Sequence, residues 1–97
     1  MRQFDLVKLS DGSLAILVQA DLLDTTLTRV VAPLLLLKGV KATPKLHPTF
    51  EVAGKTYLLA TEQLGAVLLK DIKKVVGSMK DREWDIRRAL DLVFVGV

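Results

Sequence analysis

The pattern of apolar and polar positions divides the chain into an extended first part and a helical end. Residues 4–20 nearly alternate between apolar and polar side chains on both sides of Asp11-Gly12, which predicts a β-hairpin. Residues 29–38 (RVVAPLLLLK) are almost continuously apolar and predict a buried strand. Pro33 should mark a bulge or an edge position in it, because proline cannot donate to a β-ladder. Residues 49–61 predict a second hairpin.

Polar or ambiguous segments connect these elements. Residues 21–28 and 38–45 lack periodicity and are rich in turn-forming or charged residues, so we expect loops. Residues 62–66 (EQLGA) fit a short helical turn. Residues 67–76 (VLLKDIKKVV) are ambiguous between helix and strand. We predict a strand because glycines bracket the segment and its β-branched residues cluster at its end.

The last segment has helical periodicity, and we predict a helix over residues 79–95. Apolar residues recur at spacings of four, three and four, with two neighbours that widen the stripe: Ile86, Leu90, Val93 and Val97, with Ala89 and Phe94. Ser78 followed by Asp81 has capping-box-like spacing and predicts the start of the helix. Gly96 is placed to take the left-handed conformation that closes its last turn.

Length and composition indicate one globular domain, residues 1–97, with 51% hydrophobic and 26% charged residues. Many short strands and one late helix predict a small, mostly antiparallel barrel or sheet with a helix packed on it. The formal charge of +3, with mixed signs, is too weak to indicate nucleic-acid binding by itself. The longest apolar run, residues 30–37, is shorter than the ~20 residues of a membrane helix, and residues 1–12 lack a signal-peptide pattern. We expect a soluble, cytoplasmic protein.

The side chains that could carry catalysis do not form a recognisable motif. The chain has no cysteine, which excludes disulfides, thiolate metal sites and thiol nucleophiles. His47 is the only histidine and is interpreted as a loop residue without a catalytic partner. Asp21 and Asp24 fit loop-capping roles better than an acid/base pair, and Trp84 fits a packing anchor. We therefore expect no enzyme activity, no metal and no cofactor.

The carboxyl-terminal end is apolar, with the sequence VFVGV. The carboxylate of Val97 would lie beside the negative end of the helix dipole, which costs about 0.3 to 1 kcal/mol at an exposed end. A cation from another molecule would relieve this repulsion. Two interpretations stay open: the tip is presented to a partner with an apolar crevice and an arginine or lysine, or Val93, Phe94 and Val97 pack into the protein's own core or a twofold interface.

The chain resembles the CcdB family of toxins from bacterial toxin–antitoxin modules. The matching stretches are LVQADLLDT (17–25), RVVAPLLLL (29–37), residues 45–67 and DREWDIRRALDLVFVGV (81–97). The resemblance implies a homodimer with an SH3-like antiparallel barrel, a small extra sheet and a C-terminal helix. It also implies a non-enzymatic poison that binds the DNA gyrase A protein, here gyrase A, and traps the cleaved gyrase–DNA complex. A CcdA-like antitoxin with a disordered C-terminal region would neutralise it, and operator DNA would be bound and repressed only through the antitoxin.

By position, the resemblance assigns gyrase binding to Leu22, Asp91, Phe94, Val95, Gly96 and Val97. Toxic members of the family carry tryptophan at the position of Val95 and typically asparagine at that of Asp91. Valine has no π face, so a cation–π contact worth about 0.5 to 2 kcal/mol is unavailable. One alternative is therefore an antitoxin-binding homologue that does not poison gyrase. The other is a MazF-like endoribonuclease of the same fold, with Thr25, Arg29 and His47 as acid/base or phosphate contacts.

Overall fold

The computed structural model describes residues 1–23, 25–38, 41–43 and 45–96. The strands within these residues are β1 (Asp5–Leu9), β2 (Leu14–Leu17), β3 (Thr28–Leu36), β4 (Thr49–Val52), β5 (Lys55–Leu59), β6 (Gly65–Leu68) and β7 (Ile72–Ser78). The helical elements are four short 3-10 turns and one α-helix: η1 (Asp21–Leu23), η2 (Thr61–Gln63), η3 (Leu69–Asp71), η4 (Lys80–Arg82) and α1 (Glu83–Phe94).

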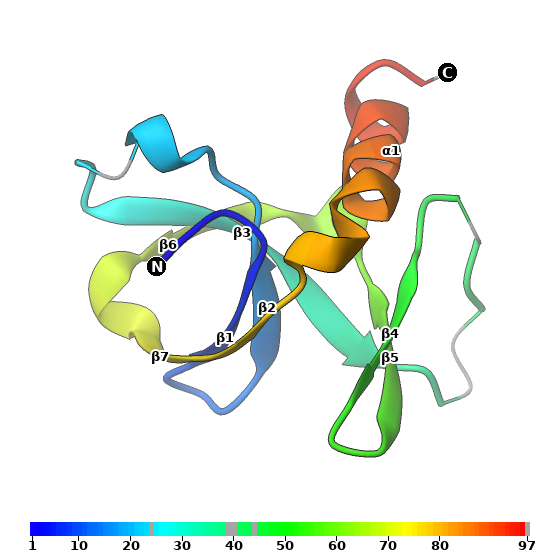
Figure 1. The fold of residues 1–97 in the computed structure, drawn as a ribbon, viewed down its shortest axis with the longest axis horizontal. Coiled ribbons are helices and arrows are strands. Elements are labelled where there is room, and N and C mark those ends of the chain that lie inside the picture. The colour runs from blue at the N-terminus through cyan, green and yellow to red at the C-terminus, as the bar shows by residue number, and fades with distance from the viewer. Residues whose placement is uncertain (24, 39–40, 44, 97) are drawn as a thin grey trace.

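The described strands form one curled antiparallel sheet in the order β4-β5-β3-β2-β1-β7 (Figure 1). Strand β3 has β2 on one side, and on the other it pairs with β6 along its first half and with β5 along its second half. The β4–β5 hairpin extends to one side of the curled part, and α1 stands beside the sheet with its end pointing away from it (Figure 1). The predicted antiparallel barrel or sheet with a C-terminal helix is confirmed.

Both predicted hairpins are confirmed, and their turns contain the backbone conformations that tight turns need. Between β1 and β2, Gly12 has a positive φ of 88°. In the same turn the hydroxyl and the backbone N–H of Ser13 donate to the carboxylate of Asp11 and lower the pKa of Asp11. Between β4 and β5, Ala53 and Gly54 have φ angles of 52° and 79°, as a two-residue turn with two left-handed positions requires.

Pro33 lies inside the sheet, so the predicted bulge or edge position is wrong. It is paired with Ala15 of β2 in an unbroken register, and its carbonyl accepts a hydrogen bond from the N–H of Ala60 on the opposite side. The N–H and C=O of one residue in an antiparallel strand point to the same side. The missing donor of Pro33 therefore faces the break between β6 and β5, where no strand needs it.

Two of the predicted connecting elements differ from the structure. The helical turn predicted at residues 62–66 is the 3-10 turn Thr61–Gln63, and Gly65 already begins a strand. The single strand predicted at residues 67–76 is divided into β6 and β7 by the turn Leu69–Asp71. The division arises because β6 pairs with β3 whereas β7 pairs with β1. The turn η3 thus carries the chain from one part of the curled sheet to the other.

The C-terminal helix begins later than predicted. Residues Lys80–Arg82 form a 3-10 turn, and the α-helix starts at Glu83. The hydroxyl oxygen of Ser78 accepts a hydrogen bond of 3.2 Å from the N–H of Lys80, so it caps this short turn instead of the helix. Arg82, which occupies the N-cap position of α1, makes no side-chain capping bond.

The core lies between the curled sheet and α1. Its main cluster contains Phe4, Leu6, Ile16, Val18, Ala32, Leu34, Phe50, Leu59 and Ile86. A smaller cluster on the other face contains Val7, Ala15, Leu17 and Val31. From α1, Ile86 and Ala89 are fully buried and Leu90 packs against the main cluster, as the periodicity predicted. In the part of the chain that the structure describes, every helix is too short or too polar to span a bilayer.

Candidate functional site

The end of α1 is an exposed apolar tip that projects from the body of the protein (Figure 1). Phe94 is 71% exposed and Val95 is 69% exposed. Gly96 has a φ of 77°, and both its N–H and that of Val95 donate to the carbonyl of Asp91. This confirms the predicted left-handed glycine that ends the helix. Val97, the sixth predicted site residue, lies outside the described residues.

The tip does not pack into the core of its own chain. Val93 is half-buried, but Phe94 points into solvent, so the prediction that both belong to the buried stripe is wrong for Phe94. Asp91 is exposed and makes no ion pair with any described residue. Its charge adds to the negative end of the helix dipole. The tip therefore combines apolar surface with negative potential.

Leu22 lies apart from the tip, on the turn η1. It is 92% exposed. The turn η1 and the end of α1 both extend toward the upper side of Figure 1, from different parts of the fold. The structure therefore gathers Asp91, Phe94, Val95 and Gly96 at one helix end and places Leu22 on a separate projection.

Arg29 fixes the loop that carries Leu22. Arg29 is only 7% exposed, and its guanidinium donates to the carbonyl oxygens of Thr26 and Thr28 at 2.5 and 2.8 Å. The carbonyl of Leu23 accepts hydrogen bonds from the side chain of Thr26 and from that of a glutamine in the preceding loop. These bonds hold the loop in one conformation, so that its leucines remain outside.

An exposed apolar patch lies beside this loop, and the sequence alone does not reveal it. Leu27, Leu68 and Leu69 are all exposed. The N–H of Leu69 donates to the carbonyl of Leu27 at 2.8 Å, and Leu68 is paired with Thr28 across β6 and β3. Leucines from two distant segments become neighbours only through this strand pairing. We call Leu27, Leu68 and Leu69 the leucine patch.

His47 has a partner from a distant segment. Its Nδ1 accepts a hydrogen bond from the N–H of Thr43 at 3.0 Å, and its Nε2 contacts the carboxylate of Glu62. This pattern places the ring proton on Nε2. Both ring nitrogens are thus engaged in pinning the loop before β4 to the turn η2. The arrangement has a structural role and leaves no nitrogen of His47 to accept a proton from a substrate.

The residues considered for RNA cleavage are Thr25, Arg29 and His47, and the structure does not bring them together. Arg29 lies five positions before Leu34, about 16 Å along the strand at ~3.3 Å per residue. His47 is attached near Leu34, because the neighbouring Pro48 accepts a hydrogen bond from Leu59, the partner of Leu34. Thr25 is exposed in its loop. Among the described residues there is also no group of three or more side chains that could hold a metal ion.

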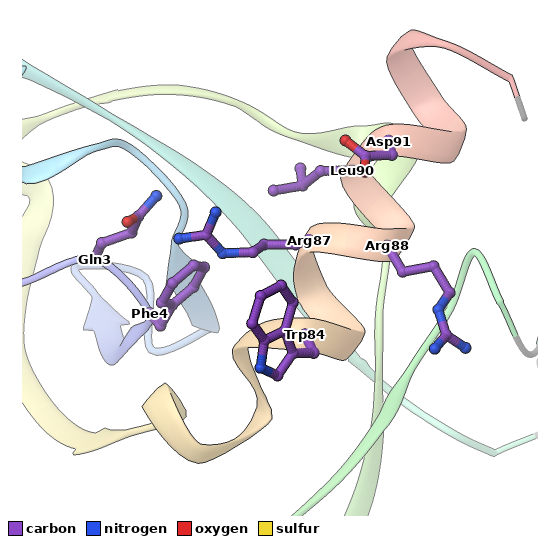
Figure 2. A pocket seen from close by; sticks show the side chains of 7 residues that line it. All are labelled: Gln3, Phe4, Trp84, Arg87, Arg88, Leu90 and Asp91. Atoms are coloured by element: carbon purple, nitrogen blue, oxygen red, sulfur yellow. The ribbon is translucent and has the colours of Figure 1, made fainter.

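A groove of about 570 Å³ runs between α1 and the N-terminal segment (Figure 2). Trp84 on its edge is 76% exposed, so the predicted role as a packing anchor is wrong. Arg87 takes that role: its guanidinium lies 5.7 Å from the ring of the buried Phe4 and 5.8 Å from that of Trp84. Arg87 is also bonded to Glu83 at 3.2 Å, which keeps it in place.

Comparisons with known proteins agree with this fold. A model of the family described as CcdB protein matches residues 3–96. Among solved structures, an endoribonuclease in complex with its cognate antitoxin from Mycobacterial species has a TM-score of 0.77 and 10% identity, covering 98% of this chain and 95% of that chain. These values indicate a shared fold over nearly the whole chain.

Two further solved structures have the same fold. The Mycobacterium tuberculosis toxin MazF-mt6 has a TM-score of 0.76 and 11% identity, covering 97% of each chain. A MazE–MazF structure from Deinococcus radiodurans has a TM-score of 0.74 and 14% identity, covering 100% of this chain and 98% of that chain. At such low identities the likeness concerns the fold and does not extend to activity.

Proposed function

The chain belongs to the CcdB family, and we propose that it is a toxin that binds gyrase A and traps the cleaved gyrase–DNA complex without being an enzyme itself. The observation that carries this proposal is the exposed tip of α1. Phe94 and Val95 offer apolar surface, and Asp91 together with the helix end offers negative potential. A partner with an apolar crevice and a cationic side chain is complementary to both. The resemblance of the tip to the family pattern names gyrase as that partner.

The active toxin is proposed to be a homodimer. Exposed apolar surface such as the leucine patch favours self-association, because contact with a second copy removes it from water. Sedimentation equilibrium should give a dimer at micromolar concentration, and replacing Leu68 by lysine should shift the protein toward monomer. A wild-type protein that sediments as a monomer contradicts this part of the proposal.

A cognate antitoxin is proposed to neutralise the toxin. Support comes from the solved structures of similar fold, which include toxins in complex with antitoxins. The antitoxin would be CcdA-like, with a disordered C-terminal region that folds on binding. Operator DNA would be contacted only through the antitoxin, since the toxin has a modest charge of +3. This requires a neighbouring gene whose product co-purifies with the toxin in the cytoplasm.

Replacing Val95 by tryptophan should strengthen binding to gyrase A. Val95 is exposed at the tip, so an indole there is accommodated and can stack on a cationic side chain. The gain corresponds to about 0.5 to 2 kcal/mol, or roughly twofold to thirtyfold in Kd. Calorimetric titration of purified gyrase A measures it.

The matched control is the same substitution at Val76, an exposed valine on β7. Val76→Trp should leave the affinity unchanged. Equal gains at both positions would indicate unspecific stickiness of the added indole and would remove the support for the tip.

Ribonuclease activity is the second candidate, because solved structures of similar fold include endoribonucleases. It is less well supported, since Arg29 is bonded to the carbonyls of its own loop and both ring nitrogens of His47 are engaged. Incubation of the pure protein with mixed-sequence RNA separates the two functions. Sequence-selective cleavage that disappears in a folded Arg29→Gln variant would establish the ribonuclease and overturn the gyrase proposal.

A further inference from the structure

Two grooves flank the outer face of α1, and the proposed gyrase contact uses neither of them. The first, here the wide groove, is the one between α1 and the N-terminal segment, with Trp84 on its edge (Figure 2). The second, here the narrow groove, has a volume of about 280 Å³ and runs between α1 and the segment before β4. Arg88 lines both grooves and therefore stands between them.

The wide groove presents aromatic and apolar surface. Trp84 has most of its indole in solvent, although its neighbour Arg87 is held against both Trp84 and Phe4. Leu90 lies further along the same groove. An exposed tryptophan beside fixed neighbours loses little conformational freedom when it is covered, and such residues dominate the energy of many protein interfaces. The wide groove therefore suits an apolar side chain.

The narrow groove carries uncompensated positive charge. Its carboxylate, Asp85, is bonded to Arg82 at 2.8 Å, and Arg82 is further fixed by the carbonyl of Thr49 and by the ring of a buried phenylalanine. The other two cations, Lys45 and Arg88, are exposed, and their side chains make no ion pair with the described residues. Two positive charges are thus available to an anionic ligand.

The distribution of charge also sets the direction of a ligand. Asp91 lines the wide groove, and its negative charge disfavours a carboxylate there. Anionic groups are therefore directed to Arg88 and Lys45, and apolar groups to Trp84. A continuous polyanion such as RNA, which would place phosphates in both grooves, fits this pattern poorly. An α-helix is about 10 Å across, so roughly three extended residues span the distance between the grooves.

We propose that the outer face of α1 binds an acidic polypeptide segment of a partner protein. An apolar side chain of the segment lies against Trp84 in the wide groove, and carboxylates about three residues away lie between Arg88 and Lys45 in the narrow groove. This surface is separate from the tip of α1, so the inference stands independently of gyrase binding.

Binding of a synthetic peptide tests the inference. The probe is a short fluorescent peptide with one phenylalanine and, three positions further on, two adjacent glutamates; its control carries glutamines instead. Anisotropy should detect the acidic peptide binding more tightly than its control. Arg88→Gln should weaken binding about twofold to fivefold, and Trp84→Ala about tenfold or more. Lys73→Gln, the same loss of charge on β7, should have no effect.

Three outcomes decide the matter. Intrinsic fluorescence of wild-type protein should change on binding, because Trp84 is its only tryptophan, and the variant lacking residues 95–97 should bind the peptide normally. Equal weakening by Arg88→Gln and Lys73→Gln overturns the inference, as does an unchanged tryptophan signal. Tighter binding of a mixed-sequence RNA oligonucleotide, lost in Trp84→Ala, overturns it in favour of a nucleic-acid site. Circular dichroism confirms that each variant is folded.

Discussion

Deleting residues 95–97 is expected to weaken binding to gyrase A by more than about 30-fold, equivalent to roughly 2 kcal/mol. The deletion removes the exposed side chain of Val95 and transfers the terminal carboxylate to Phe94, one turn deeper along the helix. Its effect on stability should be small, because the described backbone hydrogen bonds that it removes are those from the N–H groups of Val95 and Gly96 to Asp91. Binding and folding are thus separated in one variant.

Calorimetric titration against gyrase A measures the loss, and a thermal melt checks the fold. Val76→Ala is the matched control, since it shortens an exposed valine on β7 and should leave the affinity unchanged. A truncated protein that binds as tightly as the full chain would show that gyrase is contacted elsewhere.

Replacing Ile86 by alanine should lower the free energy of unfolding by about 2 to 5 kcal/mol. Ile86 is completely buried and belongs to the main core cluster together with Phe4 and Ile16. The only other fully buried residue of α1 is the small Ala89, so Ile86 supplies most of the apolar contact that holds the helix on the sheet. The orientation of the tip therefore depends on this side chain.

Urea denaturation followed by circular dichroism measures the change. Val95→Ala, in the exposed end of the same helix, is the control and should alter stability by less than about 0.5 kcal/mol. If both variants have the same stability, α1 is not held by Ile86, and the position of the tip needs another explanation.

The hairpins and the helix could be predicted from the sequence because their determinants are local. Alternating apolar residues beside Asp11-Gly12 and a glycine at position 54 specify tight turns, and the periodicity around Ile86 specifies a helix. The partners of each strand are not encoded locally. For this reason the sequence did not reveal the division of residues 67–76 between β3 and β1, or the break beside β3 that accommodates Pro33.

The candidate site was predictable to a similar degree. The tip could be identified because Gly96 and the apolar residues before it lie within one helical turn of each other. Other features depend on contacts between segments far apart in the chain. The pairing of His47 with Glu62 and the junction of Leu27 with Leu69 are of this kind. The prediction for Trp84 is wrong because Arg87, three positions further along the helix, covers the core in its place.

Gyrase-mediated DNA cleavage is the measurement that tests the proposed function most directly. Purified gyrase, supercoiled plasmid, ATP and the wild-type protein are incubated, and the products are denatured with detergent before electrophoresis. Linear DNA should accumulate with increasing toxin, more strongly with Val95→Trp and not at all with the protein lacking residues 95–97. Normal supercoiling without linear DNA at saturating wild-type protein would contradict gyrase poisoning by this chain.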